Sequence, residues 1–295
     1  MIRWLFPLLL LACGAAQAQE ARHISTHVWT EPEQANFGGL SGLELSPDGQ
    51  KFVAITDRSF VITGEIQRQN GKISALAASA PQALRASNGQ AFAGRMVDSE
   101  GLACPNLTES PLCYVSFEHG ARVERFSDLS APAKRLPIPP EFVAMQPNSA
   151  LEALAIDAQG RLYTLPERSG ALDRPFPVFR FENGTWRLAF TLRRDPPHLP
   201  TGADIGPDGR FYLLERHHAG FLQFSTRLRS FDISTGQAKD ERLHFETPLG
   251  QHDNLEALAI WRDGSDQLRA TMLSDDNFLP LQRTEIVEYA LNPSP

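Results

Sequence analysis

The chain has few cysteines and few lysines, and it lacks a basic patch, sustained helical periodicity and low-complexity linkers. Its three cysteines have no histidine pair nearby, so they do not complete a tetrahedral zinc site. The net charge is −7 and no basic patch with interleaved aromatic residues occurs, which argues against nucleic acid as a partner. Sustained helical periodicity and low-complexity linkers are absent too, so we expect neither a helical protein nor several linked domains.

Turns and short apolar strands make up most of the sequence instead. The 22 prolines and 21 glycines among 295 residues are more than a helical protein tolerates, and they suit a turn-rich chain. With 42% hydrophobic residues, the chain can bury a substantial core. We therefore predict an all-β fold.

The first residues have the features of a targeting segment. One positive charge precedes an apolar stretch, Leu5–Ala16, which is too short to span a bilayer, and Ala16–Ala18 forms a small-x-small cleavage site. We predict a signal peptide over residues 1–18 and a single domain over 19–295. Leu10–Cys13 also resembles a bacterial lipoprotein box, so a lipid anchor at Cys13 is the alternative. Either way we expect a periplasmic or secreted monomer without a transmembrane segment.

The two remaining cysteines, Cys104 and Cys113, flank a turn rich in Pro, Asn, Thr and Ser. In an oxidising compartment they can close a small hairpin loop as a disulfide. Two unpaired buried thiols are the alternative.

Five segments of the sequence repeat one layout: a small or acidic residue, a short apolar strand, a turn, a second strand and an acidic residue. Their markers lie 50 to 59 residues apart, at Leu43, Leu102, Leu154, Asp204 and Leu258. Asp and Gly in the turns, as in Ser46–Gly49, suit tight connections between strands. A repeat of about fifty residues that opens with two strands is typical of a β-propeller blade.

The sequence indicates the number of blades less directly than it indicates the propeller fold. The strand at Arg22–Thr30 precedes the first repeat and is expected to close the ring by completing the last blade. The long segment Phe60–Met96 is poor in strand signals beyond its start and is interpreted as holding an insertion. We predict six blades, with five as the alternative.

Acidic residues recur at two positions of the repeat, and a ring of blades would bring them together around one axis. The first position, before the first strand, holds Glu100, Glu152 and Glu256, with Ser41 and Gly202 in the other two repeats. The second position, after the second strand, holds Asp57, Glu118, Glu167, Glu215 and Asp275, with Asp276 adjacent. A cationic or potentially cationic residue follows it in four repeats, as Arg58, His119, Arg168 and Arg216.

So many carboxylates in a narrow channel need a counter-charge, because like charges raise one another's pKa. Calcium, which binds six to eight oxygens, is the natural candidate, and all eight acids of the two positions are its predicted ligands. Glu100, Glu152 and Glu256 are also the candidate catalytic residues, and the four cationic residues are candidates for binding an anionic substrate. The alternative is structural: the acids would bond to backbone amides or form salt bridges between blades.

The segments "FGGLSGLELSPDGQKFVAITDR", "DSEGLA", "ALEALAIDAQGRLYTLPER" and "NLEALAIW" resemble the bacterial phytase-like proteins, described as having esterase-like activity of the phytase type. The resemblance implies a β-propeller related to calcium-dependent alkaline phytases, acting outside the cytoplasm on a phosphate ester or a carboxylic ester. Lysine is scarce here, and Gly202 stands where an acid is expected. Those departures argue against phytate itself as the substrate.

Two other functions fit the same pattern. Lactonase propellers also hold a divalent ion among channel acids, so hydrolysis of a lactone is one alternative. A propeller that binds a ligand or acts as a scaffold, with purely structural acids, is the other.

Overall fold

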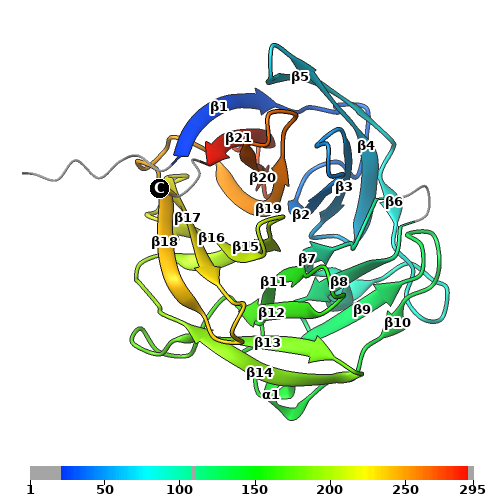
Figure 1. The fold of residues 1–295 in the computed structure, drawn as a ribbon. Helices are drawn as coiled ribbons and strands as arrows, with labels where there is room; N and C mark the ends of the chain where they lie inside the picture. Colours follow the sequence, from blue (N-terminus) through cyan, green and yellow to red (C-terminus); the bar gives the residue numbers. More distant parts are fainter. Residues whose placement is uncertain (1–20, 108–110, 292–295) are drawn as a thin grey trace, which may run out of the picture.

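The computed structural model describes residues 21–107 and 111–291, which form five antiparallel sheets arranged around a central axis (Figure 1). This confirms the all-β propeller and corrects the predicted number of blades, which is five. The segment Phe60–Met96 does not form a sixth blade, because it supplies the outer strands of the first sheet and a loop. The expected targeting segment, with Cys13, lies outside the described residues.

Each blade has four main strands, and the chain order runs from the axis outward in blades 1 to 4. Blade 1 contains β2 (Leu40–Leu45), β3 (Lys51–Thr56), β4 (Phe60–Gln69) and β5 (Lys72–Ala78), with β6 (Gln82–Ala83) pairing with β4. Blade 2 contains β7 (Ser99–Ala103), β8 (Cys113–Phe117), β9 (Arg122–Phe126) and β10 (Lys134–Arg135). Blade 3 contains β11 (Leu151–Ile156), β12 (Leu162–Pro166), β13 (Phe176–Glu182) and β14 (Thr185–Leu192). Blade 4 contains β15 (Leu199–Ile205), β16 (Arg210–His218), β17 (Phe224–Asp232) and β18 (Lys239–Glu246).

Blade 5 closes the ring. It contains β19 (Asn254–Arg262), β20 (Leu268–Asp275) and β21 (Glu285–Leu291), and its outermost strand is β1 (Ala21–Val28), which pairs with β21 from Ala21↔Leu291 to Val28↔Glu285. The prediction that the N-terminal strand completes the last blade is therefore confirmed. Two short helical turns, η1 (Gly94–Val97) and α1 (Pro140–Val143), lie in loops between blades.

The hydrophobic core consists of layers between neighbouring blades. Tyr163, Phe190 and Phe211 pack between blades 3 and 4, and Tyr212, Leu258 and Val287 pack between blades 4 and 5. Burying both faces of each sheet in this way removes most of the apolar strand surface from water. The ring is thus held by apolar contacts that are repeated around the axis.

The axis itself is closed at its middle. Leucines and small residues of the five innermost strands leave a void of only about 10 Å³ there. Glycines make this close approach feasible: a Cβ at Gly101 would stand 2.6 Å from the amide nitrogen of Leu154, and one at Gly202 would stand 2.5 Å from the carbonyl oxygen of Glu256. The two ends of the axis are consequently separate.

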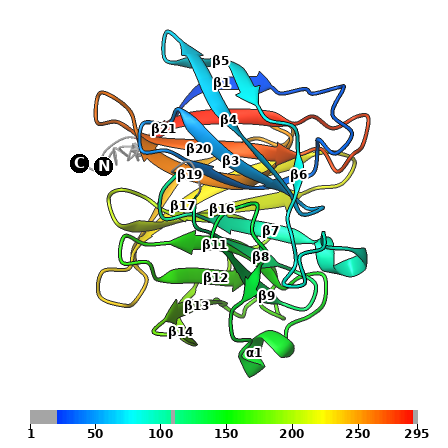
Figure 2. The same cartoon turned by 90° about the vertical axis from the view of Figure 1, so that its right-hand side faces the viewer.

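We call the end where the innermost strands begin the upper end, and the end where they turn back the lower end. Figure 2 views the blades from the side, and the turn between β11 and β12 marks the lower end on its left. The acidic residues of both repeat positions belong to segments at the upper end.

Candidate active site at the upper end of the axis

The innermost strand of every blade has a bulge near its upper end. In β11, Leu151 pairs with Pro166 and Ala153 with Leu165, so Glu152 is left without a partner in the ladder. The corresponding irregularities in the other strands leave Ser41, Glu100, Thr201 and Glu256 unpaired. Such a bulge re-aims one side chain away from the regular alternation of the strand. The first repeat position is therefore a bulged residue in all five blades.

The three bulge glutamates lie together, as the repeat predicted. Burial raises the pKa of Glu100, and the carboxylates of Glu152 and Glu256 raise it further. Burial likewise raises the pKa of Glu152, with Glu167 and Glu256 contributing. Glu152 is only 8% exposed. Residues about fifty and a hundred positions apart in the chain thus form one electrostatic unit.

Four acids of the second position belong to the same unit, and one of them is Glu167, which contributes to the raised pKa of Glu152. Burial raises the pKa of Asp57 to about 7. Burial, together with a hydrogen bond to Asp98, raises that of Glu118 to about 8. Burial and the nearby Glu256 raise the pKa of Asp275 to about 9. We call Asp57, Asp98, Glu100, Glu118, Glu152, Glu167, Glu256 and Asp275 the upper acid cluster.

Glu215 was predicted to join this cluster, and the structure places it elsewhere. Glu215 pairs with Pro200, as Pro166 pairs with Leu151, so it corresponds to Pro166 and not to Glu167. The predicted alignment of blade 4 was wrong by one residue, and a shift of one residue in a strand turns the side chain to the other face. For the same reason Thr201, and not Gly202, occupies the bulge position of blade 4.

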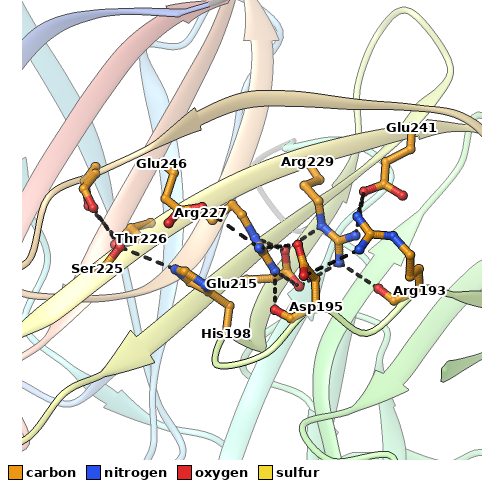
Figure 3. A network of polar contacts seen from close by, with 11 residues as sticks. Arg193, Asp195, His198, Glu215, Ser225, Thr226, Arg227, Arg229, Glu241 and Glu246 are labelled. Carbon is orange, nitrogen blue, oxygen red and sulfur yellow. Dashed lines mark hydrogen bonds and ion pairs between the residues drawn. The ribbon is translucent and has the colours of Figure 1, made fainter. Parts of the chain in front are cut away.

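Glu215 instead neutralises two arginines inside blade 4 (Figure 3). Its carboxylate is fully buried and accepts bonds from Arg229 at 2.7 Å and from Arg227 at 2.9 Å. Arg227 also donates to Asp195, and Arg229 donates to Glu241. Both oxygens of Glu215 are therefore engaged within the blade, away from the axis.

Arg216 takes the position that the sequence assigned to an acid. Its guanidinium donates to the side-chain oxygen of Asn254 at 2.5 Å and also contacts Glu256. Burial by itself would lower the pKa of Arg216, but Glu256 and the other nearby carboxylates raise it. Arg216 thus partly neutralises the upper acid cluster.

The other predicted substrate-binding residues lie at the rim. Arg168 is 52% exposed and bonds to Glu167 at 3.1 Å, and Arg58 stacks on the ring of Phe278 at 3.3 Å from its centroid. His119 Nδ1 lies 2.6 Å from an oxygen of Asp98. Asp276 holds a loop, because it accepts the amide hydrogens of Gly39 and Phe278.

The upper acid cluster has the donors that a hard cation needs. The side chains of Asp98, Glu118 and His119 offer ligand atoms within 4.8 Å of one another. Asp57 Oδ1 is buried and has no hydrogen-bond partner. Carboxylate oxygens in this number suit calcium, although a histidine beside them also suits a transition metal. The residues present therefore fit a divalent cation.

Two members of the site were missed by the sequence analysis. Asp98 and Asn254 each stand two residues before a bulge glutamate, in "DSEGLA" and "NLEALA". That shared offset is the sequence signal that identifies them.

The structure also bears on the predicted disulfide and on membrane-spanning helices. Cys104 and Cys113 form the predicted disulfide, which closes the loop between β7 and β8. Within the described part of the chain, no helix is long and apolar enough to cross a membrane.

Residues 35–278 match the sequence model of the phytase-like family, described as "Esterase-like activity of phytase". A search of curated proteins gave no match. An α-L-arabinofuranosidase structure from Podospora anserina is 13% identical, with a TM-score of 0.54, and the alignment covers 92% of this chain and 96% of that one. A gluconolactonase structure from Xanthomonas campestris is also 13% identical, with a TM-score of 0.42 and coverage of 84% and 71%. At this identity the arabinofuranosidase supports the fold alone.

Proposed function

We propose, from the premise that this chain belongs to the phytase-like family, that it hydrolyses a phosphate ester or a carboxylic ester at its upper acid cluster with the help of a divalent cation, for which calcium is our candidate. We further propose that it works in the periplasm or outside the cell, which the disulfide supports because such bonds persist in oxidising compartments.

The observation that carries this proposal is the excess of carboxylates over cations. Four blades contribute eight acidic side chains to the upper acid cluster, while three basic side chains bond to it among the described residues, namely His119, Arg168 and Arg216. Acids that serve only in structural salt bridges would each have a cationic partner, as Glu215 has within blade 4. The excess supports a cation or a substrate as part of the functional assembly.

The side chains of the cluster can then take different roles in ester hydrolysis. A divalent cation, when bound, supplies positive charge that favours an anionic substrate and its developing negative charge. Arg216 can bind a phosphate or acyl oxygen, and Arg168 and His119 can guide an anion at the rim. A carboxyl group of the cluster that does not bind the cation can exchange a proton with water or with the leaving oxygen.

A calcium titration followed by a hydrolysis screen on the purified mature chain tests the proposal. We expect calcium to raise the melting temperature and to raise turnover of a phosphate ester or a carboxylic ester. The matched control is the Glu152→Gln/Glu256→Gln double variant, which should lose both effects. Turnover confined to lactones would favour the lactonase alternative. A melting temperature indifferent to chelator, with no turnover above the double variant, would favour a binding or scaffold protein.

A further inference from the structure

The lower end of the axis opens into a cavity of about 870 Å³, which the proposed function does not use. Turns and strand ends from all five blades line it, including Pro47, Cys104, Ile156, Ile205 and Ile260. The volume is in the range of pockets that enclose small organic ligands. The closed middle of the axis separates this cavity from the upper acid cluster, so it is a second compartment.

Two carboxylates line this cavity at equivalent positions of the repeat. Glu44 in β2 pairs with Val53, and Asp204 in β15 pairs with Tyr212, which places both three residues along from the bulge. Glu44 accepts the amide hydrogen of Cys104 at 2.9 Å. Asp204 accepts the amide hydrogen of Ile260 at 2.6 Å. Each acid therefore reaches across to the next blade.

These hydrogen bonds by themselves would suggest that both acids have only a structural role. A comparison of the five blades argues that this role does not fully explain them. The same position in the other three blades is occupied by alanine, at Ala103, Ala155 and Ala259. Blades therefore pack around this axis without an acid at the position. The carboxylates of blades 1 and 4 are features of the cavity that the fold does not require.

The charged groups around the cavity leave these two acids without a counter-ion. Arg161 is bonded to Asp157 at 2.5 Å, and Arg262 is paired with Asp266 at 3.5 Å. No ion pair joins Glu44 or Asp204 to an arginine, lysine or histidine in residues 21–107 and 111–291. Burial raises the pKa of Glu44 well above its usual range, and Asp204 raises it further. A cation brought between them would remove that repulsion.

The cavity is better suited to an organic cation than to a metal ion. It offers only these two uncompensated carboxylates, whereas the group of three converging ligand side chains in the described chain lies at the upper end. The cavity is also far larger than an ion, and isoleucines and prolines make up much of its wall. An ammonium group has three donors for carboxylate oxygens, and an apolar body attached to it would contact the isoleucines.

We infer that the lower cavity binds a small protonated amine with an apolar body, its ammonium group held between Glu44 and Asp204. This inference stands apart from the proposed function, because it concerns the other end of the axis.

Calorimetric titration of the full mature chain with phenethylammonium tests the inference, and 2-phenylethanol, its uncharged analogue of similar size, is the control ligand. We expect the amine to bind at least about tenfold more tightly than the alcohol, since one charge-assisted interaction is worth about that factor. Glu44→Gln and Asp204→Asn should each weaken amine binding by about tenfold or more. Gln at position 44 keeps an oxygen that can accept the amide hydrogen of Cys104. Asn at position 204 keeps one of the two oxygens that accept the amide hydrogens of Ile205 and Ile260.

Glu256→Gln makes the same change of charge at the upper end and should leave amine binding unchanged. Absence of amine binding, equal affinity for amine and alcohol, or an equal loss in Glu256→Gln would each overturn the inference. Circular dichroism checks that the variants fold, and the comparison of amine with alcohol on the unaltered chain decides the matter if a variant does not.

Discussion

At the upper end of the axis, eight carboxylates from four blades form a cluster to which Arg216 is bonded, while the lower end has two uncompensated carboxylates in a largely apolar cavity. The same repeat builds both ends. Part of the difference arises in the backbone, because the three bulge glutamates sit on irregular residues, whereas Glu44 and Asp204 sit in regular pairing. Bulges gather side chains from many blades toward one place, whereas regular strands keep their alternation. The comparison teaches that one repeat can provide two unlike binding environments.

The largest expected effect is a loss of turnover when an acid at the upper end is replaced, compared with the same replacement at the lower end. We expect Glu152→Gln to lower ester hydrolysis by about 10²–10⁴-fold, because it removes a charged oxygen from the reacting cluster. Glu44→Gln changes the charge equally at the lower end and should leave turnover unchanged. Steady-state hydrolysis rates measured side by side check this, and an equal loss in both variants would contradict a separate upper site.

A large loss of stability is expected from a substitution inside blade 4, away from both binding environments. Replacing Glu215 by Gln removes the buried carboxylate that Arg227 and Arg229 share, although each arginine keeps a second acidic partner. Breaking a buried ion pair costs about 3–5 kcal/mol, and the remaining partners should keep the loss near the lower value. Urea unfolding measures the loss. The shift of the melting temperature on adding calcium should stay as in the unaltered chain, and loss of that shift would return Glu215 to the list of metal ligands.

The pH dependence of stability should sharpen the comparison further. The pKa values of Asp57, Glu118 and Asp275 are raised in the folded state to about 7, 8 and 9. Between the ordinary pKa of about 4 and these values, the folded state binds more protons than the unfolded state. The metal-free protein should therefore lose stability as the pH rises from about 4 to 9.

Calcium should reduce this slope, because it replaces the protons as counter-charge. Thermal melts across that pH range, with chelator and with calcium, provide the measurement. Stability that rises with pH in the metal-free protein would show that the upper acids are already compensated.

The smallest effect is expected from neutralising one acid without metal present. Glu100→Gln should raise the melting temperature of the metal-free protein, with a gain on the order of 1 kcal/mol, because it removes a buried repulsion. In saturating calcium the same change should lower it. Differential scanning calorimetry in both conditions checks the reversal, and a loss of stability in both would favour a structural role for Glu100.

Much of the upper site could be predicted from the repeat, since Glu100, Glu152 and Glu256 do lie together. The number of blades could not, because Phe60–Met96 shows weak strand signals while supplying the outer strands of blade 1. Glu215 was misplaced because it is adjacent to Arg216 in the sequence, and only the pairing with Pro200 shows which of the two occupies the repeat position.

By itself, the sequence determined the class of fold, the strand that closes the ring and the disulfide, because hydrophobic alternation, turn residues and cysteine spacing are local features. The tertiary structure alone decided that five blades complete the circle, that the axis is closed in the middle and that a second cavity exists below. These properties depend on how closely neighbouring blades approach one another. That distance is set by side-chain volume and bulges acting together around the whole ring.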